Sequence, residues 1–124
     1  MKNRVLWIAL ILSVLCWGSA AARTADGKLR VVVTYSAYHS IAEYVGGDKV
    51  VVSHIVEGDQ DPHIVRPKPS LAVLLKSADV YVATGMDLEM WSPALVDMSG
   101  NPNIRSGQKG YVSPTLMSKY QRDA

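Results

Sequence analysis

The chain has 124 residues, of which 48% are hydrophobic and 19% charged, and its formal net charge is +2. This length limits it to one domain or to one lobe of a larger protein. The ordinary apolar fraction and low net charge exclude a disordered chain, while nine glycines and one cysteine exclude collagen-like and disulfide-scaffold classes. From Arg23 onward, 11 Lys and Arg residues balance 11 Asp and Glu residues, so the charge gives no argument for binding nucleic acid.

The first 22 residues have the three parts of a secretory signal peptide. Lys2 and Arg4 are followed by the apolar run 5–17 and then by the small residues 18–22. A retained membrane anchor is the alternative, but the apolar run is shorter than the roughly 20 residues of a membrane span. A bulky Leu15 before Cys16 disfavours lipid attachment, so we expect Cys16 to be lost with the leader. The exported chain would then use His, Asp, Glu or water for any metal chemistry.

The exported part alternates between strand and helix patterns. The β-branched run 29–34 predicts a strand buried on both faces, and the spacing within 41–45 predicts a helix that stops at Gly46-Gly47. A second strand is predicted over 50–56, and a long loop over 57–69.

The second half continues this alternation. Ser70 is expected to cap a helix whose apolar side contains Leu71, Leu74, Leu75 and Ala78. A third strand over 80–83 follows, then a helix over 88–98 in which Pro93 must lie near the start or bend the helix, and a short strand at 111–112. The predicted fold class is therefore α/β, with a parallel sheet flanked by helices. Ligands of such sheets bind beyond the carboxyl ends of the strands.

The strongest candidate for chemistry at these ends is His63. It lies in a loop that Pro62, Pro67 and Pro69 make stiff, and a stiff loop suits a metal ligand. Asp61 would orient the imidazole or supply negative potential. The alternative is a surface histidine in a proline-rich turn.

The other histidines are weaker candidates. His39 follows the first strand. It either points toward the carboxyl ends of the strands, near His63, as a weak metal ligand, or helps to cap the nearby helix. His54 alternates with valines and is expected to be a half-buried strand residue.

The remaining polar residues do not form a catalytic set. Asp87 and Glu89 are expected in the first turn of a helix, where an acid is favourable, and Trp91 is expected to be a packing anchor. Ser36 and Ser40 near His39 lack a nucleophile-elbow pattern, and nothing apolar surrounds Asp59 and Asp61 to raise a pKa. We therefore expect that the protein is not an enzyme, and a small exported hydrolase that uses Ser and His is an alternative.

A set of motifs in a fixed order makes a more specific link. They are Gly47-Asp48, Asp61-Pro62-His63, Pro69-Ser70, Ala78-Asp79, Gly85 through Leu88-Glu89, Gly100-Asn101-Pro102 and Gly110-Tyr111. From Val31 to Val112 the chain resembles the N-terminal lobe of the solute-binding proteins of zinc/manganese ABC transporters (solute-binding protein family 9, ZnuA/TroA-like).

This resemblance implies two α/β lobes joined by a long helix, with Zn²⁺ or Mn²⁺ held between them and delivered to an ABC permease. It implies that His63 is the first-lobe ligand, that the protein is periplasmic or otherwise extracytoplasmic, and that residues 23–124 form a truncated N-terminal lobe without the second one. The alternative is a non-transporting remnant that is only a surface-exposed structural domain. A four-ligand zinc site is worth about 10–16 kcal/mol, so one imidazole at an equal share gives about millimolar affinity.

Overall fold

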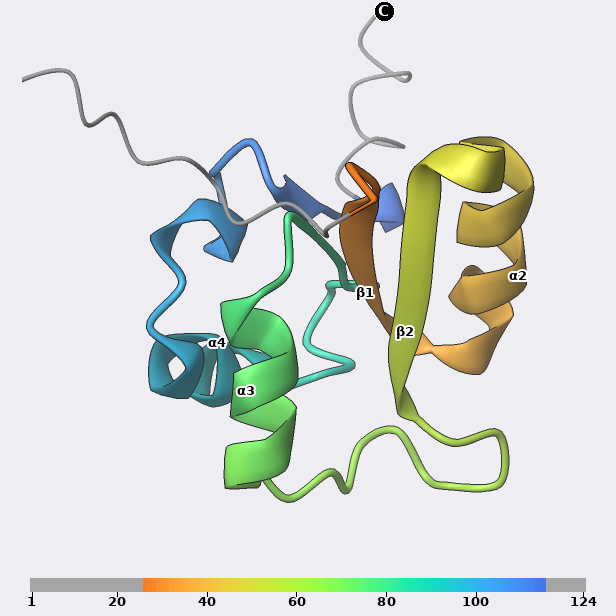
Figure 1. Cartoon of the computed structure of the whole chain (residues 1–124). Helices are drawn as coiled ribbons and strands as arrows, with labels where there is room; N and C mark the ends of the chain where they lie inside the picture. The colour runs from red at the N-terminus through yellow and green to blue at the C-terminus, as the bar shows by residue number, and fades with distance from the viewer. Residues whose placement is uncertain (1–25, 116–124) are drawn as a thin grey trace, which may run out of the picture.

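The computed structural model describes residues 26–115 (Figure 1). Its elements are β1 (Leu29–Tyr35), α2 (Ser36–Gly46), the short 3-10 turn η1 (Gly47–Lys49), β2 (Val50–Val56), α3 (Pro69–Lys76), β3 (Val80–Val82), α4 (Ser92–Ser99), the 3-10 turn η2 (Pro102–Ile104) and β4 (Tyr111–Val112). None of the helices in this part is both long and apolar enough to cross a membrane. The predicted leader and Cys16 lie outside the described residues.

The four strands form one parallel sheet in the order β2-β1-β3-β4. β1 lies in the interior of the sheet, with Val33 opposite His54 of β2 and Val32 opposite Tyr81 of β3. Residues 31–34 are all buried, as the β-branched run predicts. The predicted α/β class with a parallel sheet is confirmed.

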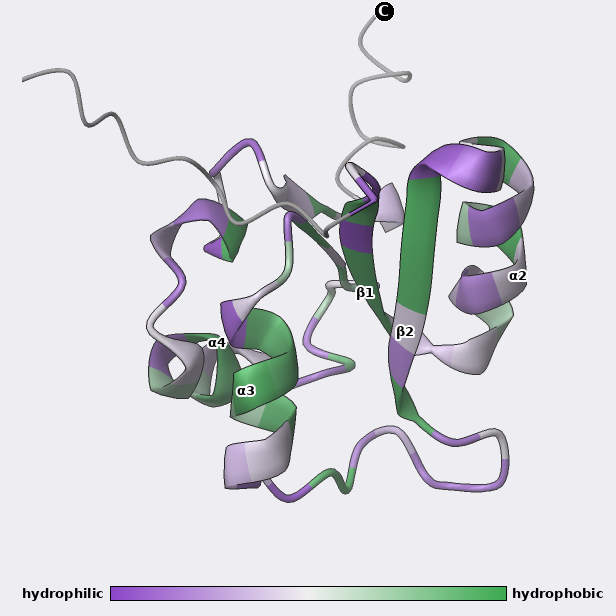
Figure 2. Ribbon diagram, viewed as in Figure 1, coloured by the Kyte–Doolittle hydropathy of each residue, from purple (hydrophilic) through white to green (hydrophobic). Residues whose placement is uncertain are grey.

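Helices cover both faces of the sheet. Figure 1 shows α2 on one side of β1 and β2, and α3 with α4 on the other. The main core lies on the α3 and α4 side, and Figure 2 shows hydrophobic residues on the strands and on these two helices. By contrast, α2 has no buried residue, and it leaves Ile41, Tyr44 and Val45 exposed, Tyr44 to 91%.

Two helix starts differ from prediction, and proline explains both. α3 begins at Pro69 after Lys68, so Ser70 is inside the helix and the prediction that it is the N-cap is wrong. α4 begins at Ser92 rather than near Leu88, with Pro93 in its first turn. Proline fits the first helical turn because the missing N–H has no partner there in any case.

The predicted stop of α2 is confirmed, since Gly47 has a φ of 54° that glycine adopts without strain.

A buried asparagine fixes the end of α3 to the next part of the chain. The Asn101 amide donates to the carbonyl oxygens of Leu75 at 3.0 Å and Ala78 at 2.9 Å, and its Oδ1 accepts from the N–H of Asn103 at 3.1 Å. The Leu75 carbonyl also accepts from the N–H groups of Ser77 and Ala78, so Asn101 adds a further hydrogen bond there and joins the end of α3 to the segment before η2.

Tyr81 of β3 is the largest fully buried side chain of the core. Its hydroxyl lies 2.7 Å from the Ser92 hydroxyl at the start of α4. Burial raises the pKa of Tyr81 well above its ordinary value of 10.0, and the negative charge of Glu89 acts in the same direction. The folded state therefore holds this phenol in its neutral form.

We predict that stability falls above pH 10 and that Tyr81 contributes to this loss. In that range the unfolded chain has released the phenolic proton and the folded chain has not, so the free energy of unfolding decreases as pH rises. Tyr81→Phe should be less stable by about 1 kcal/mol near pH 8, because it loses one hydrogen bond. The difference should shrink at higher pH, as measured by urea unfolding at several pH values. An unchanged difference from pH 8 to pH 11 would contradict the prediction.

Candidate functional site

The predicted metal-ligand loop connects β2 to α3 at the carboxyl end of the sheet. It is organised by turns, in which the N–H of Gln60 donates to the Glu57 carbonyl at 3.0 Å and the N–H of Ile64 to the Asp61 carbonyl at 3.1 Å. Figure 2 shows it as a largely hydrophilic segment. The loop therefore presents polar groups on a fixed path between two packed elements.

His63 and Asp61 form one unit within this loop. Asp61 Oδ1 accepts from both the backbone N–H and the Nδ1 of His63, each at 2.9 Å. The backbone N–H first, and then the imidazole, lower the pKa of the Asp61 carboxyl. Because a carboxylate only accepts hydrogen bonds, this contact selects the neutral tautomer with the hydrogen on Nδ1 and the lone pair on Nε2. The His63 side chain is 60% exposed, which leaves it open to a ligand from solvent.

Trp91 ties this loop to the body of the protein. Its indole N–H donates to the carbonyl oxygen of Pro62 at 2.8 Å, one residue before His63. Trp91 is itself buried in the main core, so the predicted role of a packing anchor is confirmed. The hydrogen bond adds a positioning role, because it links the backbone next to His63 to a side chain that cannot move freely.

Glu89 is buried and does not lie in the first turn of a helix, so that prediction is wrong. α4 begins three residues later, and Glu89 instead accepts from the Thr34 hydroxyl at 2.9 Å and from the N–H groups of Thr84 at 2.9 Å and Gly85 at 3.1 Å. Thr34 is in β1 and Thr84 follows β3, so one carboxylate bridges the carboxyl ends of two neighbouring strands. Burying a carboxylate is costly unless donors satisfy it, and here three do.

The turn that brings Glu89 to this position has an unusual backbone. Gly85, Met86 and Asp87 have φ values of 82°, 56° and 62°, so three consecutive residues are left-handed. The left-handed region is unfavourable for residues other than glycine, and such strain concentrates at functional sites.

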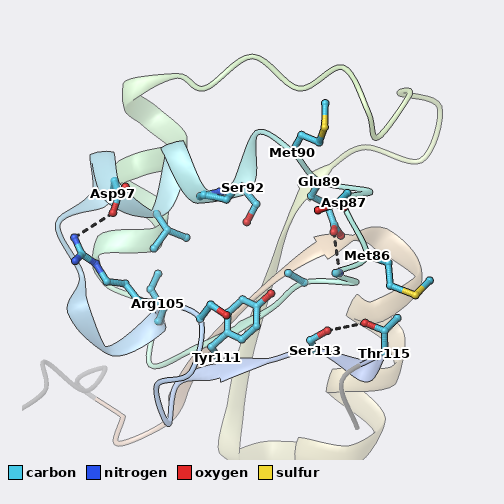
Figure 3. Close-up of a pocket in the computed structure, with 16 residues that line it drawn as sticks. Met86, Asp87, Glu89, Met90, Ser92, Asp97, Arg105, Tyr111, Ser113 and Thr115 are labelled. Carbon is cyan, nitrogen blue, oxygen red and sulfur yellow. Dashed lines mark hydrogen bonds and ion pairs between the residues drawn. The ribbon is translucent and has the colours of Figure 1, made fainter. Parts of the chain in front are cut away.

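Two hollows adjoin this end of the sheet. Figure 3 shows the larger, of ≈ 760 Å³, lined by residues that include Glu89, Ser92, Tyr111 and Ser113. The smaller, of ≈ 450 Å³, lies against the loop and is lined by Glu57, Asp61 and Lys68 among others. His63 is not among the residues that line these two hollows, and its side chain is 60% exposed.

The other two histidines lie together. His39 of α2 and His54 of β2 place their Nδ1 atoms 3.2 Å apart, and both rings are partly buried. The predicted half-buried strand position of His54 is confirmed. The contacts of His39 are with His54 and Glu43, whereas those of His63 are with Asp61. The structure thus gathers the histidines into a pair and a single residue.

Sequence reasoning missed what Glu89 and Trp91 do. Trp91 was expected to pack, but its donor to Pro62 depends on a contact across 29 positions. Glu89 has apolar neighbours on both sides, Leu88 and Met90-Trp91, which is the signal that an acid here is drawn into the core.

Residues 31–120 match the family described as zinc-uptake complex component A, periplasmic (ZnuA). The metal ABC transporter substrate-binding lipoprotein SloC of Streptococcus mutans serotype c is 37% identical over 90 residues, 72% of this chain and 29% of that protein. The manganese-binding lipoprotein MntA of Halalkalibacterium halodurans is 26% identical over 113 residues, 90% of this chain and 36% of its own.

Solved structures give the same relationship. A crystal structure of ZnuA superposes with a TM-score of 0.55 and 33% identity, covering 60% of this chain and 29% of that one. The Zn(II)-bound AdcA of Streptococcus pneumoniae superposes with a TM-score of 0.52 and 27% identity, covering 60% and 16%. This chain therefore spans only 16% to 36% of the length of these four proteins.

We predict that Glu89→Ala destabilises the fold by about 3 kcal/mol, because it leaves one buried and two partly buried donors without an acceptor. Asp97→Ala is the control, since it breaks an exposed ion pair with Arg105 and should cost less than about 1 kcal/mol. Urea unfolding of both variants measures the difference. Equal losses in the free energy of unfolding would show that the hydrogen bonds of Glu89 stabilise the fold no more than an exposed ion pair does.

Proposed function

We propose, because this chain belongs to the periplasmic zinc-uptake component A family, that it is the first lobe of an exported metal-binding protein whose cargo is Zn²⁺ or Mn²⁺. In this proposal His63 is a ligand of the transported ion. The lobe comprises residues 23–124, follows a leader over 1–22, works outside the cytoplasmic membrane and delivers the ion to an ABC permease. Its function is to bind rather than to catalyse.

The observation that carries the proposal is the orientation of the His63 imidazole. Asp61 holds Nδ1 through a hydrogen bond, and this leaves Nε2 as the ring atom that binds a metal. Metal-binding histidines characteristically donate their other N–H to a carboxylate or carbonyl, which fixes the tautomer and raises the basicity of the ligand. The loop thus has the inner ligand and its orienting partner in place before any ion arrives.

One imidazole does not hold a metal tightly. Within residues 26–115 no group of three or more His, Cys, Asp or Glu side chains is placed to hold a metal ion. The remaining ligands must therefore come from outside these residues, from a second lobe or another chain. Added carboxylates would favour Mn²⁺ and added imidazoles Zn²⁺, so those ligands decide which ion is carried.

We predict that this chain binds Zn²⁺ at His63 with about millimolar affinity. The measurement is a Zn²⁺ titration followed at the ¹⁵N resonances of each imidazole, which separates His63 from the other histidines. Asp61→Asn should weaken binding at His63 by about tenfold, because a carboxamide is a poorer partner for Nδ1–H. Asp59→Asn is the matched control, since it removes the same charge two residues away. Resonances of His63 that stay unmoved at several millimolar Zn²⁺ would overturn the proposal.

A second prediction concerns Trp91. Trp91→Phe keeps an aromatic ring in the core but removes the hydrogen bond to Pro62, so the loop should become more mobile in ¹⁵N relaxation measurements. Binding of Zn²⁺ at His63 should weaken by up to about tenfold. Ile104→Val, which also removes core volume but lies in η2, should leave both readouts unchanged. If the two variants behave alike, the hydrogen bond does not position the ligand.

A further inference from the structure

Four side chains form a continuous row between α2 and β2, separate from the His63 unit. Glu43 Oε1 lies 3.2 Å from His39 Nε2, the two Nδ1 atoms of His39 and His54 lie 3.2 Å apart, and His54 Nε2 lies 3.2 Å from Glu57 Oε2. The order is therefore acid, imidazole, imidazole, acid. The proposed function makes no use of this row.

Counting protons along the row shows that its centre is suited to a cation. Each carboxylate accepts only, so each Nε2 must carry a hydrogen to make its outer contact. When both rings are neutral, those two hydrogens leave a bare lone pair on each Nδ1, and the two lone pairs face each other. A positive ion between the two Nδ1 atoms turns this contact from repulsive to attractive.

The distance between these atoms also fits a metal ion. Zinc binds imidazole nitrogen at about 2.0–2.1 Å, so two such ligands at a tetrahedral angle are separated by about 3.3 Å. The two rings are nearly perpendicular, with an interplanar angle of 74° and centroids 5.2 Å apart, so they do not stack and their Nδ1 atoms are the atoms brought close together. We propose that His39 and His54 form a second metal site, which takes a borderline divalent transition-metal ion such as Zn²⁺ through their Nδ1 atoms.

The two carboxylates act as outer partners rather than as ligands. Glu43 and Glu57 contact the Nε2 atoms, on the sides of the rings away from the shared point. This matches the described part of the chain, which has no cluster of three or more protein ligands. Water completes the coordination sphere, and the site is exchangeable and open to solvent. The carboxylates fix the tautomer that exposes both Nδ1 lone pairs.

The surroundings allow an ion to enter. The side chains of His39 and His54 are 27% and 28% exposed, and those of the two glutamates more than twice as much. Because α2 has no buried residue, it can shift by a few tenths of an ångström to reach the ideal ligand separation. A bound ion would join this helix to the edge strand of the sheet.

Affinity distinguishes this site from His63. Two imidazoles on one ion bind more tightly than one, so Zn²⁺ should fill the histidine pair at a concentration at least about tenfold below that needed at His63. No second chain is needed. The inference therefore stands or falls separately from the proposed function.

The test is a Zn²⁺ titration of the full chain carrying His63→Ala, followed at the imidazole ¹⁵N resonances. We expect the Nδ1 resonances of His39 and His54 to move together and to saturate at one ion per chain. Adding His54→Gln to the same background should weaken binding at least about tenfold, and His39→Gln should do the same from the helix side.

Two further variants test the outer carboxylates in the same background. Glu57→Gln should weaken binding about tenfold, whereas Asp59→Asn, an equal loss of charge on the same loop, should have little effect. Amide spectra of each variant establish that it is folded. The proposal is overturned if Zn²⁺ binds the folded His54→Gln and His39→Gln variants as well as the parent, or if the Nε2 resonances move instead of Nδ1.

Discussion

The position of the His63 loop depends on one hydrogen bond, from the Trp91 indole to the Pro62 carbonyl. A loop of this length between two elements has many conformations, and its three prolines reduce them without selecting one. Trp91 selects one, because it is buried in the core and its N–H needs an acceptor. Asp61 then sets the ring of His63. The packing of Trp91 in the core thus sets the path of the loop, and the loop holds Asp61 and His63 where the imidazole is oriented.

Glu89 explains why Trp91 lies where it does. In the order β2-β1-β3-β4, the chain passes from β1 to β2 on one side and then crosses back over β1 to β3 on the other, so the strand order reverses at β1. Open α/β sheets usually bind ligands beyond the strand ends where the order reverses. Here the Glu89 carboxylate lies between the ends of β1 and β3, held by Thr34, Thr84 and Gly85, and it lines the larger hollow. The strained turn at Met86 and Asp87 brings the carboxylate inward, and Trp91 follows two residues later.

Much of the fold follows from local patterns. The β-branched run of β1, the glycine stop after α2 and the proline in the first turn of α4 all have the physical meaning that the sequence suggests. The start of α3 was misplaced because Ser70 is a good capping residue, yet Pro69 before it is already suited to the first helical turn. The backbone geometry of Pro69 therefore determined the helix start, and the capping preference of Ser70 did not.

The site was less predictable, and for a consistent reason. Asp61 and His63 are two residues apart, so their contact is local and visible in the sequence. Glu89 meets Thr34 across 55 positions, and His54 meets His39 across a helix and a turn. Such pairings depend on strand register and helix placement. His39 and His54 each read as unremarkable residues, and only the parallel pairing of β1 with β2, with α2 against them, brings them together.

The weak anchoring of α2 has a consequence for the molecule as a whole. Because α2 has no buried residue, we expect it to be among the parts that detach first when thermal motion opens the structure locally. Detachment separates His39 from His54, so an ion held by both would bind only the closed form. Binding that favours one form stabilises it by mass action. The fraction of molecules in which α2 is packed against the sheet would then rise with the free metal concentration around the protein.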